Sequence, residues 1–400
     1  MVDKVRYYLE QSVPELEDLK TKGLFDKNEI TMIMRRRTEF EYRIVGRGST
    51  PKDFLRYSEF EQNLEKLRKK RYNRLSKVGL IETKPSISDW AGVRRIMFIL
   101  DRATQRFPGD DELWAQYLKF AKANGAIKAV YKIYSKLLQL QPRNIDAWLS
   151  STKYEFETNG NAKGARLLFQ RALRLNPESL TLWLNYAQFE LTYVSKLLAR
   201  RKVLGLLTES QQKADEEKEN EKEREKDTDD MIALTDDERL SIPEMNMLGN
   251  PDTNPALKGD VMLAIFDVCV PTVVKYFNHP QDKAFEIAEK MLKIIDKFED
   301  LNRDYLYQHI LHYLQREYPE DLRTALIDIT LPIRNVTSTS NELATLLQLS
   351  VNKFIKYKNT LKDDALTNMY TNQLSNQFLD NKSAKVDGLL KAIIKKCRTY

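Results

Sequence analysis

The sequence contains few of the residues that interrupt helices, because glycine and proline occur only 13 times each among 400 residues. Their scarcity favours a mostly helical chain. Apolar runs are also short, since polar residues interrupt the stretches at 261–266 and 268–274, whereas a membrane span needs roughly 18 apolar residues. The first residues lead into an amphipathic helix and show no secretory signal. We therefore expect a soluble protein with no membrane partner.

Cysteine and histidine are scarce as well, with two and three copies. Cys269 and Cys397 stand far apart in the sequence, so we predict no disulfide framework and a reducing compartment, either the cytosol or the nucleus. His309 and His312 lie three residues apart, but the further ligands that a closed zinc site needs are not nearby in the sequence. We predict that the histidines and cysteines are structural and bind no metal.

Two common catalytic motifs are missing too. The sequence has neither a phosphate-binding loop ending in Gly-Lys-Ser/Thr nor a Gly-x-Ser-x-Gly elbow. No pairing of a nucleophile with a base stands out either. We therefore expect no catalytic residue, no cofactor and no small-molecule substrate, and we predict that the protein is not an enzyme.

The charge is unevenly distributed along the chain. The formal net charge is +7, yet residues 209–230 hold eleven acidic and five basic residues, which leaves +13 for the remainder. A basic chain is attracted to polyanions, of which nucleic acid is the common candidate. Charge alone leaves RNA contact and simple solubility open. We interpret the acidic segment as a solvated tether. The alternative is that it acts as a mimic that engages a basic partner.

An internal repeat is the strongest pattern in the sequence. Trp114, Trp148 and Trp183 follow one another at intervals of 34 and 35 residues. A proline stands six residues before each tryptophan and ends the preceding helix, because it lacks an amide proton; these prolines are Pro108, Pro142 and Pro177. Such a period is typical of helical hairpins that stack on one another.

Further aromatic residues keep the phase of the tryptophans. A buried aromatic ring removes about 150–250 Å² from water, and one helical pair cannot bury several rings alone. Stacked neighbours can, so we predict an all-α, right-handed superhelical solenoid. We expect its aromatics to form the core rather than to stack on bases. The predicted repeat core consists of Trp114, Tyr117, Phe120, Tyr134, Pro142, Trp148, Tyr154, Phe169, Pro177, Trp183, Tyr186 and Phe189.

The details of the repeat point to one class. The glycine of tetratricopeptide repeats and their tyrosine seven residues after the tryptophan are missing, whereas Glu155 and Glu190 stand at that seventh position. This pattern resembles the half-a-TPR, or HAT, repeat, which is found in proteins of RNA-processing assemblies. An earlier copy begins at Phe54 and has Glu61 at the same offset. Trp90 is out of phase because it lies near the start of that copy's second helix.

The N-terminal part of the chain carries a second resemblance. The runs MIMRRRTEFEYRI from Met32, GRGS from Gly46 and FLRYSEFE from Phe54 resemble the N-terminal signature of the U3 small nucleolar RNA-associated protein 6 family. This resemblance implies a subunit of the UTP-B subcomplex of the small-subunit processome, which handles pre-ribosomal RNA in the nucleolus. The implied partners are the WD40 propeller subunits of UTP-B, with the U3 small nucleolar ribonucleoprotein and pre-rRNA in the same assembly.

Four stretches organise the chain in this interpretation. Residues 1–85 form an N-terminal helical region that includes a long helix beginning near Pro51 and becoming basic. Residues 86–207 form HAT repeats, residues 208–258 a charged, disordered linker, and residues 259–400 divergent helical repeats. Within the last stretch we expect helices centred on 343–357 and 386–394.

Two basic runs are the candidate contact residues. Clusters of Lys and Arg favour contact with RNA or an acidic protein, and they also serve as nuclear import signals. A solvated helix face explains such runs equally well. The candidates are Arg35, Arg36, Arg37, Lys66, Arg68, Lys69, Lys70, Arg71, Arg74 and Lys77.

Three functions follow from these patterns. We favour a non-catalytic scaffold that supports pre-18S rRNA processing and 40S ribosomal subunit assembly through protein contacts. One alternative is a module that binds RNA directly through the basic runs. The other is a HAT scaffold of pre-mRNA splicing or 3′-end processing, which should lack the specific N-terminal signature.

Overall fold

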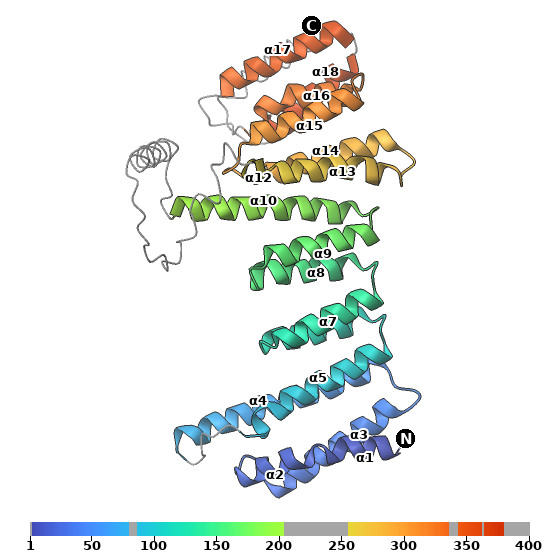
Figure 1. Cartoon of the computed structure of the whole chain (residues 1–400), viewed down its shortest axis with the longest axis vertical. Helices are drawn as coiled ribbons and strands as arrows, with labels where there is room; N and C mark the ends of the chain where they lie inside the picture. The colour runs from blue at the N-terminus through green and yellow to red at the C-terminus, as the bar shows by residue number, and fades with distance from the viewer. Residues whose placement is uncertain (1, 80–85, 204–254, 336–342, 362–363, 380–400) are drawn as a thin grey trace, which may run out of the picture. The chain divides into compact units, whose positions relative to one another are not determined.

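The computed structural model describes residues 2–79, 86–203, 255–335, 343–361 and 364–379, and these residues contain helices and no β-strand (Figure 1). They belong to two compact units, Met1–Ser151 and Thr152–Tyr400. The all-α helical-repeat class is therefore as predicted. No helix in the described ranges combines the length and the apolar character that crossing a membrane requires.

The first unit consists of consecutive helices in which α3 packs on α4, α4 on α5, α5 on α6 and α6 on α7. The predicted long helix begins at Pro51, where proline costs no hydrogen bond, and the backbone N–H of Thr50 donates to the Asp53 carboxylate at 2.9 Å. The helices are α1 (Val2–Glu10), α2 (Val13–Thr21), α3 (Lys27–Val45), α4 (Pro51–Lys77), α5 (Ser88–Arg106), α6 (Asp111–Ala123), α7 (Ile127–Leu140) and most of α8 (Ile145–Lys153).

The second unit is also a succession of helices that pack on their neighbours. In the described range that starts at residue 255, the first helix begins at Pro255, and α17 begins at Leu343, where a helix is predicted. The elements are α9 (Ala162–Leu175), α10 (Leu180–Val203), α12 (Pro255–Lys258), α13 (Asp260–Val274), α14 (Pro280–Ile295), α15 (Arg303–Glu317), α16 (Leu322–Thr330), α17 (Leu343–Leu361) and α18 (Asp364–Leu374), with the short turns η1 (Tyr154–Thr158), η3 (Leu331–Ile333) and η4 (Ser375–Leu379).

Helices α4 and α5 form the closest helical pair of the first unit. Phe54 and Tyr57 of α4 are buried against Ile99 and Ala103 of α5, as the proposed early repeat copy requires. Gly92 permits the close approach, because a Cβ at this position would lie only 2.6 Å from Glu65 Oε2. This pair supports the region that carries most of the candidate contact residues.

A recurring hydrogen bond explains the interval between proline and tryptophan. The indole N–H of Trp114 donates to the carbonyl oxygen of Pro108 at 3.0 Å. The equivalent bonds join Trp148 to Pro142 at 2.9 Å and Trp183 to Pro177 at 3.0 Å. The six-residue interval therefore places the buried indole N–H next to a carbonyl oxygen in the turn before the helix.

Most of the predicted repeat core is buried, with three exceptions. Phe120 and Pro177 are half-buried, and Pro142 is exposed. The prediction was therefore wrong for Pro142, whose ring faces outwards while its carbonyl oxygen makes the contact with the indole.

The longer of the two intervals between tryptophans has a structural cause. In the repeat that contains Trp148, the first helix consists of α8 and the π-helical turn Tyr154–Thr158, which accommodates one extra residue. The distance in sequence from Trp148 to Ala162, where α9 begins, is one residue longer than the distance from Trp114 to Ile127, where α7 begins. Both of these second helices then begin at an equal distance before the next proline in the sequence. The additional residue is thus confined to one turn.

Several predictions concern residues outside the described ranges. These are most of the 208–258 linker, including the acidic segment, the helix expected at 386–394, and Cys397. The division into two units falls after Ser151, inside the predicted 86–207 stretch. The four-part organisation itself stays a prediction.

Candidate partner-binding surface

The first basic run divides between the surface and the interior. Arg35 and Arg36 on α3 are 84% and 66% exposed and lie within 3.5 and 3.1 Å of Glu39. Arg37 is fully buried, and its Nε and Nη2 donate to the two carboxylate oxygens of Glu61 at 2.7 and 2.9 Å. The inclusion of Arg37 among the contact residues was therefore wrong, because its side chain faces the interior of the unit.

The Arg37 pair belongs to a buried charge network that sequence reasoning missed. Arg37 Nη2 also lies 3.5 Å from Glu15 of α2, and Arg95 of α5 pairs with Glu15 and approaches Glu61 to 3.8 Å. Although burial opposes the charged form, Glu61 and Glu15 raise the pKa of Arg37 above its ordinary value. Four helices, α2 to α5, are thus connected by charge-assisted hydrogen bonds.

The second run also contributes to the interior. Arg68 is buried, and its Nε and Nη2 donate to Glu65 at 2.8 Å each while Nη1 donates to Asp89 at 3.1 Å. Arg71 is 31% exposed and makes two 2.8 Å hydrogen bonds to Glu29. Arg68 and Arg71 therefore stabilise the helical packing, which corrects their assignment as free contact residues.

The pairing with Arg71 has an electrostatic consequence for Glu29. Hydrogen bonds from Arg71, followed by one from the backbone N–H of Asp26, lower the pKa of Glu29 from 4.5 to about 2. The same Arg71 Nη1 donates to the carbonyl oxygen of Leu24 at 2.9 Å. The end of α4 is thereby attached to the start of α3 and to the loop before it.

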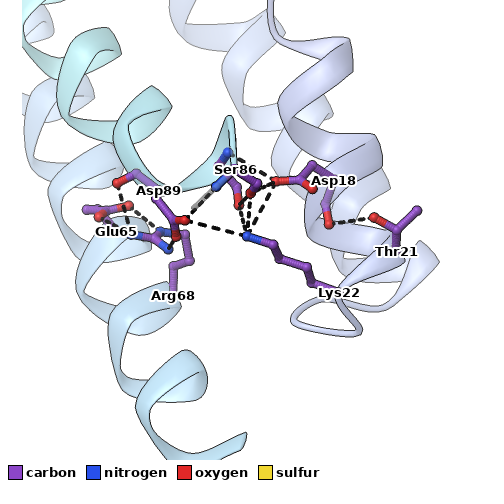
Figure 2. Close-up of polar contacts among 8 residues, drawn as sticks. Asp18, Thr21, Lys22, Glu65, Arg68, Ser86 and Asp89 are labelled. Carbon is purple, nitrogen blue, oxygen red and sulfur yellow. Dashed lines mark hydrogen bonds and ion pairs between the residues drawn. The ribbon is translucent and has the colours of Figure 1, made fainter. Parts of the chain in front are cut away.

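Figure 2 shows how the start of α5 is attached to α2 and α4. The hydroxyl of Ser86 donates to Asp18, and the backbone N–H of Ser88 donates to the same carboxylate at 3.1 Å. Lys22 lies between Asp18 and Asp89, with its Nζ 3.7 and 3.6 Å from their oxygens. Although burial raises it, the hydrogen bonds from Ser86 and Ser88 leave the pKa of Asp18 below its ordinary value. This cluster fixes where α5 begins.

Five members of the second run remain at the surface. Lys69 is 54% exposed and lies 3.6 Å from Glu65. The other four recur at intervals of four, four and three residues, which places them on one side of the helix. Among the described residues, none of these four has an ion-pair partner. We refer to them as the basic face of α4: Lys66, Lys70, Arg74 and Lys77.

The histidines and the described cysteine lie in the second unit. His309 Nε2 is 3.1 Å from both carboxylate oxygens of Asp267. Cys269 is buried, and this burial raises the pKa of its thiol to about 12. Within the described ranges, no group of three or more His, Cys, Asp or Glu side chains is placed to hold a metal ion.

Comparison with known proteins gives two matches along the chain. Residues 9–95, which contain the buried charge network, match the family model described as U3 small nucleolar RNA-associated protein 6. The predicted resemblance is confirmed. Residues 99–219 match the model described as PRP39 N-terminal HAT repeat, which confirms the repeat class.

Curated relatives agree with the first match. U3 small nucleolar RNA-associated protein 6 of Schizosaccharomyces pombe is 38% identical over 204 residues, covering 51% of this chain and 41% of the relative. The Dictyostelium discoideum homolog is 26% identical over 339 residues, with coverages of 81% and 52%. The human homolog is 30% identical over 157 residues, with coverages of 39% and 26%. The chain thus spans about half, or less, of the length of these relatives.

Proposed function

We propose that this chain is a non-catalytic scaffold subunit of UTP-B in the nucleolar small-subunit processome, where it supports pre-18S rRNA processing and 40S ribosomal subunit assembly. The match of residues 9–95 carries this proposal, because the relatives that share the similarity are named for association with U3 small nucleolar RNA. The proposed partners are the WD40 subunits of UTP-B, with U3 ribonucleoprotein and pre-rRNA in the same assembly.

The repeats support a role in protein contacts. Their in-phase aromatic residues are used in packing, and stacked helical hairpins leave long surfaces available to partners. The match at 99–219 concerns the repeats, which occur in more than one RNA-processing assembly. The match at 9–95 is what favours the nucleolar assembly over a scaffold of splicing or 3′-end processing.

The proposal is tested by affinity purification of the tagged full chain at low salt, with and without ribonuclease. Mass spectrometry identifies the proteins and sequencing identifies the RNA. We expect a stoichiometric set of WD40 proteins that survives ribonuclease. Recovery of RNA together with proteins that all disappear after ribonuclease treatment would refute the scaffold function.

Direct RNA contact is a second candidate, favoured by the basic face of α4. When unpaired protein cations contact RNA phosphates, the counterions condensed on the RNA are released, so the affinity for RNA falls as the salt concentration rises. The triple variant Lys66→Gln, Lys70→Gln and Arg74→Gln should weaken RNA binding and reduce the slope of log affinity against log salt by about 2. The matched control neutralises three exposed lysines of α6 and α7, and an equal loss there would exclude this face: Lys119, Lys128 and Lys132.

A further inference from the structure

A groove in the first unit lies between the α1–α2 pair and helix α5. Its cavity measures about 500 Å³. Tyr8, Gln11 and Pro14 line it on the side of α1 and α2. Trp90 and Phe98 are among the residues that line it on the side of α5. Its lining includes Tyr57 of the α4–α5 packing but none of the four residues of the basic face of α4.

The α5 wall presents large apolar side chains to solvent. One stripe of side chains runs along the exposed side of α5 from the residue before its start. Its members stand at intervals of three, four and four residues, which places them on one side of the helix: Ile87, Trp90, Arg94 and Phe98. Trp90 is 54% exposed, in contrast to the buried tryptophans of the repeats. Clustered exposed apolar side chains mark interaction sites, and tryptophan is enriched where binding energy concentrates.

The charges of the groove are mostly neutralised by one another. Arg102 makes hydrogen bonds of 2.8 and 2.7 Å to the two oxygens of Glu41. Arg95 pairs with Glu15. Arg94 also lines the groove, is exposed, and has no ion-pair partner in the described part of the chain. The groove thus offers one available cation beside its aromatic side chains.

The walls of the groove are held in place before any partner binds. Asp18 of α2 accepts hydrogen bonds from Ser86 and Ser88 at the start of α5 (Figure 2). Across the groove, the Arg102 guanidinium lies 4.6 and 4.7 Å from the ring centres of Tyr8 and Phe98. A preorganised site loses less conformational entropy on binding.

This combination selects one kind of occupant. An RNA backbone requires several free cations, whereas this groove has one beside the carboxylates of Glu15 and Glu41. We propose that the groove binds a short segment of a protein partner that carries a bulky apolar side chain next to an acidic one. The apolar side chain contacts Trp90 and Phe98, and the carboxylate pairs with Arg94. The inference rests on the proposed scaffold function and names a surface for it.

The test selects binders to the purified full chain from a phage library of random dodecapeptides, followed by fluorescence anisotropy with the enriched peptides. We expect enriched sequences with a bulky apolar residue within four positions of Asp or Glu. Trp90→Ala and Arg94→Glu should each weaken binding at least about tenfold. Arg171→Glu and Tyr276→Ala, at exposed positions on α9 and beyond α13, are the matched controls and should leave affinity unchanged.

A charge reversal separates a direct contact from a folding defect. Replacing the peptide's acidic residue by lysine should restore binding to the Arg94→Glu variant but weaken binding to the unaltered chain. Enriched peptides without an acidic residue, or affinities that neither substitution changes, would overturn the inference. So would a short poly(U) RNA whose binding depends on Trp90 and Arg94. The peptide assay needs no assembled particle, so it can fail while WD40 proteins still co-purify, and it can succeed when they do not.

Discussion

The buried pair of Arg37 and Glu61 predicts that neighbouring arginines differ sharply in their effect on stability. Removing one partner of a buried ion pair costs about 3–5 kcal/mol. Arg95 lies 3.8 Å from Glu61 and also pairs with Glu15, so it compensates part of the charge left behind. We therefore expect Arg37→Met to lower the free energy of unfolding by about 3 kcal/mol, the lower end of that range.

This loss is large enough to measure on the full chain. At about 2–4 °C per kcal/mol for a unit of this size, the melting temperature should fall by about 6–12 °C. The control Arg36→Met changes an arginine that is 66% exposed and should alter stability by no more than about 0.5 kcal/mol. Circular dichroism measures both transitions. Hydrogen exchange should show faster opening of α3 and α4 in Arg37→Met only.

A double variant tests the physical cause. Arg37→Met with Glu61→Leu removes the stranded carboxylate as well, so it should recover about 1 kcal/mol or more relative to Arg37→Met alone. The reasoning is refuted if Arg36→Met and Arg37→Met melt at the same temperature, or if the double variant is less stable than Arg37→Met.

Three further predictions concern other parts of the chain. Trp148→Ala should cost about 3–5 kcal/mol and lose partner binding only together with stability; abolished binding at an unchanged melting temperature would contradict this. The lowered pKa of Glu29 means that its pairing with Arg71 stabilises the fold above pH 4.5 and loses this effect as pH falls towards about 2. Because the side chain is 38% exposed, Glu29→Gln should reduce the change in unfolding free energy over this pH range by only about 1 kcal/mol, as urea titrations at pH 2 to 5 can measure. Cys269 should resist iodoacetamide at pH 8 until urea unfolds the chain, as mass spectrometry of the labelled peptide can show.

Nine of the twelve predicted repeat-core residues are buried, because the aromatic residues keep the phase of the tryptophans and so lie on the packed faces of their helices. The basic runs were harder, since their composition suggested one surface. Helical phase could have separated them, because Arg37 follows the buried Ile33 by four residues and precedes the buried Ile44 by seven. Arg68 similarly follows Glu65 by three residues on the buried side of α4.

Periodicity could not have supplied the partners of Arg37. Its charge is buried because other helices bring carboxylates to it, and Glu15 and Glu61 lie on helices other than that of Arg37. The groove beside α5 depends on tertiary structure in the same way. Its walls come from segments that are far apart in the chain, and the out-of-phase position of Trp90 was the one signal of it in the sequence.

The π-helical turn Tyr154–Thr158 has a consequence for how repeats of this kind can change length. An inserted residue between Pro142 and Trp148 would move the indole away from the carbonyl oxygen that it contacts at 2.9 Å. An insertion near the end of the same hairpin helix only widens one turn, as the longer interval between tryptophans shows. Length variation is therefore tolerated at the C-terminal end of the first helix of the hairpin and excluded just before its N-terminal end. Further copies in such chains are best recognised by a fixed six-residue spacing from proline to tryptophan within a period that is free to vary.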